Sequence, residues 1–141
     1  MTPDPEADRN RELVRRIFEE GINDGNDAIF QELLSPGYVN HDLPAPRPGP
    51  DGFAMVIGVF RTGFPDMTFY VDEVIVGGNL VSTRGYLTGS HQGEFMGVQP
   101  SGEQILVKYI DHWRFEDGQA QESWVSLDLL GLMQQIGAIG S

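Results

Sequence analysis

The chain has 141 residues, the size of a single domain, and 40% of them are hydrophobic, enough to build a core. Its 9 Lys and Arg residues are outnumbered by 21 Asp and Glu residues, so the formal net charge at pH 7 is -12. Such an acidic chain is not expected to bind nucleic acids or anionic membranes, and the absence of cysteine excludes disulfides, thiolate nucleophiles and Cys-ligated metals.

The first residues show no targeting signal. Residues 1–9 mix acids, prolines and arginines and contain no apolar stretch, so they match neither a signal peptide nor a membrane span. We expect this segment to be frayed. The remaining residues, 10–141, are expected to form one domain of a cytoplasmic protein.

The first half of the chain predicts helices. Residues 10–22 carry apolar side chains at helical spacing, and a short helix over residues 28–34 follows Asp27 as its N-cap. A third helix is expected to begin at Asp51. The segment before it, residues 42–50, has a proline at every second position from 44 to 50, which predicts a loop at the rim of a site.

The second half of the chain predicts a β-meander. Its β-branched and aromatic residues gather in four runs, over residues 67–76, 80–89, 105–115 and 119–127. Turns that contain Gly with Asn or Asp join the first run to the second and the third to the fourth, as in β-hairpins. A short strand over 91–97 and a closing helix after Asp128 complete the pattern. Helices followed by strands indicate an α+β fold, in which a curved antiparallel sheet packs against N-terminal helices and carries a short C-terminal helix.

The run over residues 105–115 has one carboxylate on an apolar face. Alternate side chains of a strand point to opposite faces, so one face carries Ile105, Val107, Tyr109, Asp111, Trp113 and Phe115. An unpaired charge is strongly disfavoured there. Two interpretations remain open for Asp111. Either it lines an apolar pocket that raises its pKa and makes it a general acid or base near neutral pH, or it accepts hydrogen bonds from an Arg or a loop backbone.

Other polar side chains are candidates for the same cavity. His91, which follows a strand, can exchange a proton near neutral pH. Tyr38 and Asn40 are two residues apart and face the same way in an extended segment, where they could hold a water or a substrate carbonyl. Arg84 and Tyr86 share a strand face, and Arg84 is the obvious cation to neutralise the buried carboxylate. Each of these residues also has a purely structural interpretation.

Cofactor sites are not indicated. The three histidines, His41, His91 and His112, lack helical ligand spacing, so no metal site is expected. The glycines form no Gly-x-Gly-x-x-Gly loop, and there is no Gly-x-Ser-x-Gly nucleophile elbow. We therefore expect no metal and no organic cofactor.

Four phrases of the sequence point to a known family. They are Ser-Pro-Gly-Tyr-Val-Asn at 35–40, Gly-Ser-His-Gln-Gly-Glu-Phe-Met-Gly at 89–97, Asp-Gly at 117–118, and Asp-Leu-Leu-Gly-Leu-Met-Gln-Gln-Ile-Gly at 128–137. In these phrases the chain resembles the SnoaL-like polyketide cyclases of the nuclear-transport-factor-2-like superfamily. The resemblance implies a cone-shaped α+β barrel around a hydrophobic pocket, usually in a homodimer, without a cofactor.

The resemblance also implies a chemistry. Family cyclases close a ring by an intramolecular aldol reaction, in which a carboxylate and a histidine move the protons, and Asn40 matches a pocket asparagine. Two positions depart from the family pattern: the acid/base aspartate falls on Val125 here, and the pocket histidine falls on Asp111. Either Asp111 has taken over proton transfer, or the pocket performs another reaction, such as epoxide opening or dehydration, or only binds.

We therefore predict a cofactor-independent cyclase or isomerase that acts on an apolar, polyketide-like molecule by general acid-base catalysis. Asp111 and His91 are the predicted catalytic residues. The predicted substrate-binding residues are Tyr38, Asn40, Met55, Phe60, Arg84, Tyr86, Tyr109, Trp113 and Trp124.

Two other functions remain open. One is a non-catalytic ligand-binding or dimerisation domain of the same fold, in which Asp111 is ionised and paired with Arg84. The other is an epoxide hydrolase of the limonene type, which needs an Asp-Arg-Asp trio whose third member again falls near Val125. The expected partners are an apolar small molecule and a second copy of the chain.

Overall fold

Five strands form one curved sheet in the computed structural model, which describes residues 4–140. In chain order the strands are β1 (Leu34–Asn40), β2 (Thr68–Gly77), β3 (Leu80–Ser90), β4 (Gln104–Glu116) and β5 (Gln119–Leu127). The helices are α1 (Pro5–Arg16), the π-helix η1 (Ile17–Asn23), α2 (Ala28–Leu33), α3 (Gly49–Gly63) and α4 (Leu129–Gln135). The predicted α+β class is confirmed.

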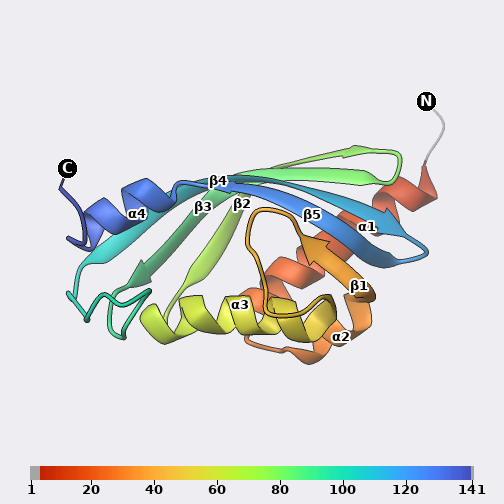
Figure 1. Ribbon diagram of the computed structural model, residues 1–141. Helices are drawn as coiled ribbons and strands as arrows, with labels where there is room; N and C mark the ends of the chain where they lie inside the picture. Colours follow the sequence, from red (N-terminus) through yellow and green to blue (C-terminus); the bar gives the residue numbers. More distant parts are fainter. Residues whose placement is uncertain (1–3, 141) are drawn as a thin grey trace.

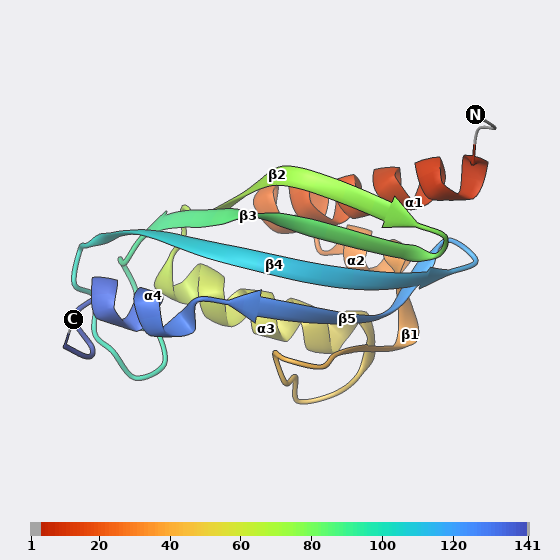
Figure 2. The ribbon, with the colours of Figure 1, turned by 90° about the horizontal axis from the view of Figure 1, so that it is seen from above.

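The helices cover one face of the sheet. Figure 1 shows α1, α2 and α3 on the same side, with the short α4 at one end next to the C-terminus. Seen from above (Figure 2), the strands lie over these helices and the opposite sheet face is open. We call the helix-covered face the inner face and the open one the outer face.

The sheet is mixed, whereas an antiparallel sheet was predicted. The order is β1-β5-β4-β3-β2, and the four strands from β2 to β5 pair antiparallel as expected. β1 is the exception, because it pairs parallel with β5 at the edge. It contains Pro36 and Gly37, residues typical of turns, so the sequence alone does not predict a strand here. Proline is tolerated there because an edge strand leaves some N–H groups unpaired.

The first helix begins earlier than predicted. Residues 5–9 are helical rather than frayed, because the Asp4 carboxylate accepts hydrogen bonds from the N–H groups of Glu6 and Ala7, both at 3.1 Å. Pro5 stands at the first helical position, where its fixed φ angle favours a helix. The rest of the segment expected to be frayed, residues 1–3, lies outside the described residues.

Two other local predictions are corrected. α3 begins at Gly49 instead of at Asp51, whose carboxylate instead accepts a hydrogen bond from the Gln31 amide at 2.7 Å. Residues 91–97 form a loop in place of a strand, and only an isolated bridge joins Phe95 to Val98. Gly97 has a φ of 82°, a left-handed conformation that interrupts extended backbone.

The alternation along β4 separates the two faces as predicted. Its odd-numbered residues from 105 to 115 are buried on the inner face, while Leu106 and Ile110 on the outer face are 52% and 61% exposed. Phe18 of η1 and Phe53 of α3 pack edge-on against Trp113 of β4, with ring centroids 6.1 and 6.2 Å apart. Aromatic rings thus fill the part of the core between η1, α3 and the inner face around Trp113.

Asn10 and Asn23 provide a matched test of this packing. Asn10 is buried, and within residues 4–140 neither its amide nitrogen nor its amide oxygen has a hydrogen-bond partner. Asn23 donates to the Phe69 carbonyl at 2.9 Å and accepts from the Phe69 N–H at 2.8 Å. In urea denaturation, Asn10→Leu should raise the free energy of unfolding by about 1 kcal/mol, because it removes an unsatisfied amide. Asn23→Leu should lower it by about 1–3 kcal/mol. Equal losses in both variants would contradict the assignment.

Candidate functional site

A carboxylate without a cationic partner lies at the centre of the inner face. Asp111 of β4 is 7% exposed, and none of the ion pairs formed within residues 4–140 includes it. Its partner is neutral: the hydroxyl of Thr83, directly opposite on β3, donates to Asp111 Oδ1 at 2.5 Å. The Thr83 hydroxyl also lies 3.4 Å from the hydroxyl of Tyr109.

Burial sets the protonation of this group. Loss of water raises the pKa of Asp111 from 3.8 to about 7, and the Thr83 hydroxyl, the Trp113 indole and the Thr83 backbone only partly oppose the rise. A raised pKa is what the first of the two open interpretations of Asp111 expects. Near neutral pH the carboxyl is therefore present in both its acid and its base form, as proton transfer requires.

An aromatic cage surrounds the carboxylate. Tyr109 and Trp113 flank Asp111 on the same strand face, and the Tyr38 ring stacks on Trp113 at 6.0 Å with an angle of 15° between the planes. Phe53 closes the cage edge-on against Tyr38 at 5.6 Å. The structure thus brings together Asp111 and three of the predicted binding residues.

Tyr38 is a hydrogen-bond donor within this cage. Burial raises its pKa well above the usual range of a phenol, so it stays protonated, although Ser123 and Asn40 partly oppose the effect and the Asp111 charge adds to it. Its hydroxyl pairs with the Ser123 hydroxyl across 2.5 Å. Ser123 lies opposite Trp113 in the sheet, so this polar pair adjoins the carboxylate.

A groove of about 570 Å³ opens beside the cage, under the proline-rich segment that precedes α3. Its walls include Tyr38, Asn40 and Phe53 together with residues 43–49 of that segment. Asp111 does not line this groove. It borders a separate depression of about 410 Å³, together with Asp42 and Val125. The predicted rim loop and the predicted residues Tyr38 and Asn40 therefore meet at the entrance of the candidate site.

The proline-rich segment is tied to the sheet where it leaves β1. The Asn40 side-chain oxygen accepts hydrogen bonds from the N–H groups of Asp42 and Leu43, at 2.9 and 3.0 Å. The Asp42 carboxylate accepts from the Val125 N–H at 2.8 Å. The carbonyl half of Asn40 is thus used within the turn, while the Asn40 side chain also stabilises the charged form of the neighbouring Tyr38.

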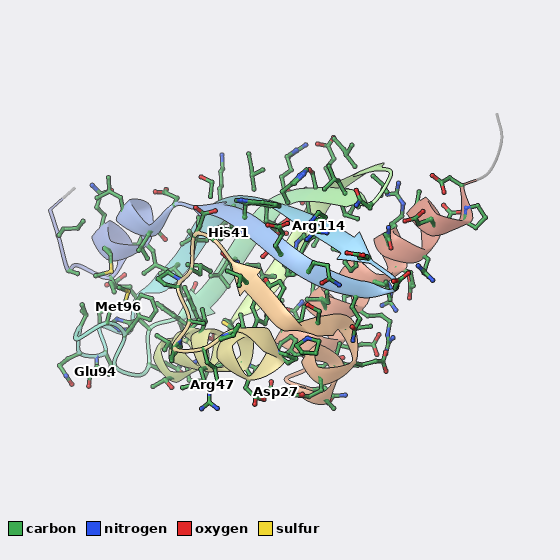
Figure 3. All side chains as sticks on the ribbon, turned by 45° about the vertical axis from the view of Figure 1, so that its right-hand side comes forward. Asp27, His41, Arg47, Glu94, Met96 and Arg114 are labelled. Carbon is green, nitrogen blue, oxygen red and sulfur yellow. The ribbon has the colours of Figure 1, made fainter. Side chains whose placement is uncertain are left out.

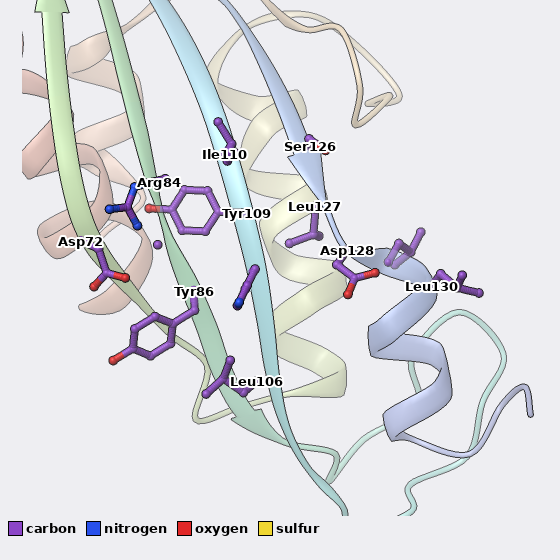
Figure 4. Close-up of a pocket in the computed structure, with 13 residues that line it drawn as sticks. Asp72, Arg84, Tyr86, Leu106, Tyr109, Ile110, Ser126, Leu127, Asp128 and Leu130 are labelled. Atoms are coloured by element: carbon purple, nitrogen blue, oxygen red, sulfur yellow. The ribbon is translucent and has the colours of Figure 1, made fainter. Parts of the chain in front are cut away.

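Arg84, Tyr86 and Trp124 lie on the outer face, which corrects three predicted site residues. Figure 4 shows Arg84 and Tyr86 in an outer-face depression of about 730 Å³ that extends to Leu130. Arg84 binds Glu73 at 3.0 Å and so cannot neutralise the buried carboxylate. Thr83, one residue earlier on the strand, takes the inward position. The Trp124 ring stacks on His41 at 5.0 Å, outside the core.

Met55 and Phe60 are also placed away from the carboxylate. Met55 is 43% exposed, because it follows the inward Phe53 by two residues, about half a helical turn. Phe60 is buried, but it packs on Phe95 at 5.2 Å, in the part of the core next to the loop after β3.

His91 is remote from Asp111, which corrects the predicted catalytic pair. Thr83 pairs with Asp111 and Ser90 pairs with Gln104 seven residues further along the strands, a span of roughly 20 Å or more. Figure 3 shows Glu94 and Met96, in the loop that follows His91, at the end of the molecule away from Arg114. The His91 ring is buried and lies 2.9 Å from the Ser101 hydroxyl, so its role here is to hold this loop.

The described residues show neither a metal cluster nor a membrane helix. Among residues 4–140, no three or more His, Asp or Glu side chains gather as ligands for a metal ion. In the same range no helix has the length and apolar character to cross a membrane.

Comparisons with known proteins agree on one family. The family model of the SnoaL-like polyketide cyclases matches residues 12–136. A solved structure from Jannaschia sp. CCS1, provisionally named a SnoaL-like polyketide cyclase, is 32% identical, with 99% of each chain covered and a TM-score of 0.87. No curated protein matches the chain.

Two Streptomyces structures are similar as well. IdmH from Streptomyces antibioticus, provisionally named a polyketide cyclase, is 29% identical, covering 91% of this chain and 98% of its own, with a TM-score of 0.79. TsrD from Streptomyces laurentii is 25% identical, covering 99% of this chain and 100% of its own, with a TM-score of 0.80.

The buried carboxylate predicts a pH dependence of stability. The folded-state pKa of Asp111, about 7, lies above the 3.8 of an unfolded chain, so its contribution to stability is full below about pH 4 and is lost as the pH rises through 7. The Asp111→Asn variant does not lose this stability as the pH rises, because its amide does not ionise. The difference in unfolding free energy between the two proteins, from urea titrations, should shift by up to about 4 kcal/mol between pH 4 and 8 in favour of the variant.

Asp66→Asn is the control for this experiment. The Asp66 carboxylate accepts hydrogen bonds from the Ser90 N–H at 2.7 Å and from its hydroxyl at 2.8 Å, and the backbone bond holds the pKa of Asp66 below its usual value. Its stabilisation is therefore lost as the pH falls, the opposite direction. A pH-independent difference between Asp111→Asn and the parent protein would contradict the assignment.

Proposed function

The chain belongs to the SnoaL-like polyketide cyclase family, and on this basis we propose that it is a cofactor-independent cyclase or isomerase whose substrate is an apolar, polyketide-like molecule. One observation carries the proposal: the buried carboxyl of Asp111 has a neutral hydrogen-bond partner and a pKa raised to about 7. A group of this kind can take up and return a proton near neutral pH.

In the proposed reaction the ionised Asp111 removes a proton from the carbon next to a ketone carbonyl. The C–H electrons form the C=C bond of an enolate, and the carbonyl electrons move to oxygen. The enolate carbon then attacks a second carbonyl of the same molecule, which closes a ring through a new C–C bond. Asp111 returns its proton to the resulting alkoxide and ends in its starting form.

The aromatic cage gives the proposed site its selectivity. Tyr38 and Phe53 line the groove, and in this proposal a substrate in the groove reaches the carboxylate when these rings move. A flat, apolar molecule can replace the ring contacts that it displaces. The protonated Tyr38 hydroxyl and the Asn40 amide then supply hydrogen bonds to its oxygen atoms.

The other two functions have less support. A non-catalytic domain was expected to pair Asp111 with Arg84, but Arg84 binds Glu73 on the outer face. A limonene-type epoxide hydrolase needs the same arginine beside the carboxylate and a second aspartate near Val125. The placement of Arg84 weighs against both.

Exchange of ketone hydrogens tests the proposed base. The protein should catalyse exchange of the α-hydrogens of α-tetralone, an apolar bicyclic ketone, in heavy water, followed by proton NMR. The rate should rise as the pH increases through about 7, because the ionised form of Asp111 is the base. Asp111→Asn should lower the catalysed rate by about 100-fold or more.

Asp66→Asn is the matched control, since Asp66 lies beside Ser90 at the end of β3, far along the strand from Thr83 and Asp111. It should leave the exchange rate unchanged. Full exchange activity in a folded Asp111→Asn protein would rule out the proposed role of the carboxylate.

We also propose that two copies of the chain pair through the outer face. This face is open in Figure 2, and it carries apolar side chains that water contacts in the single chain: Leu106, Ile110, Trp124 and Leu130, which are 52%, 61%, 37% and 63% exposed. Large exposed apolar side chains gathered on one face are typical of interaction sites. A homodimer is the assembly that the family resemblance implies.

The dimer is testable by substitution. Ile110→Asp places a charge in the middle of the outer face and should convert a dimer to a monomer in sedimentation-velocity experiments. Val59→Asp is the control, because Val59 is 48% exposed on α3, on the other side of the molecule. A parent protein that sediments as a monomer at all concentrations would contradict the proposal.

A further inference from the structure

The indole N–H of Trp113 has no acceptor. The Trp113 side chain is 3% exposed, and among residues 4–140 its Nε1 atom has no hydrogen-bond partner. A buried indole N–H normally finds a partner, because leaving it unsatisfied costs its full desolvation. An unpaired donor of this kind, beside a buried carboxylate, requires an explanation.

The two polar groups that adjoin Trp113 are engaged with other partners. Asp111, two residues earlier on the same strand face, accepts the Thr83 hydroxyl at 2.5 Å. Ser123, opposite Trp113 in the sheet, pairs with Tyr38 at 2.5 Å. The indole is close enough to Asp111 to favour its charged form, but it does not reach hydrogen-bond geometry. The donor and the base are therefore close neighbours on one strand face.

Trp113 packs against two of the rings that line the groove. The Tyr38 ring stacks on Trp113 at 6.0 Å, and Phe53 meets it edge-on at 6.2 Å. Both rings also line the groove under the proline-rich segment. A molecule that enters from the groove and moves these rings therefore meets the Trp113 indole and the Asp111 carboxylate together.

We propose that Trp113 is a catalytic residue whose indole N–H binds the carbonyl oxygen of an enolisable ketone while Asp111 faces the α-hydrogen of the same ketone. The inference rests on the proposed function and adds the position of the substrate oxygen. It also narrows the ligand class, since an oxygen acceptor must lie next to an acidic C–H bond.

The chemistry needs both groups at once. As Asp111 removes the α-hydrogen, negative charge moves to the ketone oxygen, and a fixed N–H donor stabilises that charge more strongly than it binds the neutral ketone. When Asp111 returns the proton, the charge leaves the enolate and the hydrogen bond weakens again. No oxidant, reductant or further reactant takes part.

Two ligands of the same shape test the hydrogen bond. α-Tetralone carries the carbonyl oxygen, and its exocyclic methylene analogue replaces that oxygen with a CH₂ group. The chain has 2 tryptophans, so an isotope-labelled protein gives two indole N–H signals in an NMR spectrum, which Trp113→Phe and Trp124→Phe assign. α-Tetralone should move the Trp113 signal downfield, whereas the methylene analogue should not. Neither ligand should move the Trp124 signal downfield.

Affinity and rate provide the second measurement. Trp113→Phe keeps an aromatic ring but loses the donor, so it should weaken α-tetralone binding about 10-fold relative to the methylene analogue and slow α-hydrogen exchange. Trp124→Phe should change neither. If α-tetralone binds and Asp111-dependent exchange occurs without a shift of the Trp113 signal, the inference is overturned and the proposed function stands. If neither ligand binds at millimolar concentration, both are overturned.

Discussion

The burial of one carboxylate among neutral partners is the constraint on which the site depends. Asp111 occupies the inner face of β4 among aromatic rings, with the Thr83 hydroxyl as its hydrogen-bond partner, so burial raises its pKa to about 7. The sheet keeps cations away from it: Arg84 and Arg114 point to the outer face and bind Glu73 and Glu122 there. The cost of holding this charge without a cation is the source of its reactivity.

Much of this site could be predicted from the sequence, because strand periodicity is strict. The alternation over residues 105–115 is enough to place Asp111, Tyr109 and Trp113 on one buried face. The short turn between β4 and β5 also predicts that these two strands pair as a hairpin. The relation between β3 and β4 could not be predicted in the same way. The loop over residues 91–103 separates them, so the sequence leaves the register open, and a shift of one residue exchanges Arg84 for Thr83.

The position along a strand or helix explains why His91 and Met55 lie away from the site where they were predicted. His91 belongs to a phrase typical of the family, but it lies at the far end of the strands from Asp111, where it holds the loop through Ser101. Met55 is only two residues from Phe53, but on a helix this places it on the opposite side. Sequence spacing determines the face of an element more reliably than it determines which ends of elements meet.

Direct titration of Asp111 tests its isolation in the core most clearly. In a protein labelled with carbon-13 at the aspartate carboxyl groups, the signal that disappears in Asp111→Asn belongs to this residue. We expect that signal to titrate near pH 7, because burial without a cation disfavours the charged form. A signal that titrates near pH 4 or below would show that a cation or strong donors stabilise the carboxylate, and it would contradict the acid-base role assigned to Asp111.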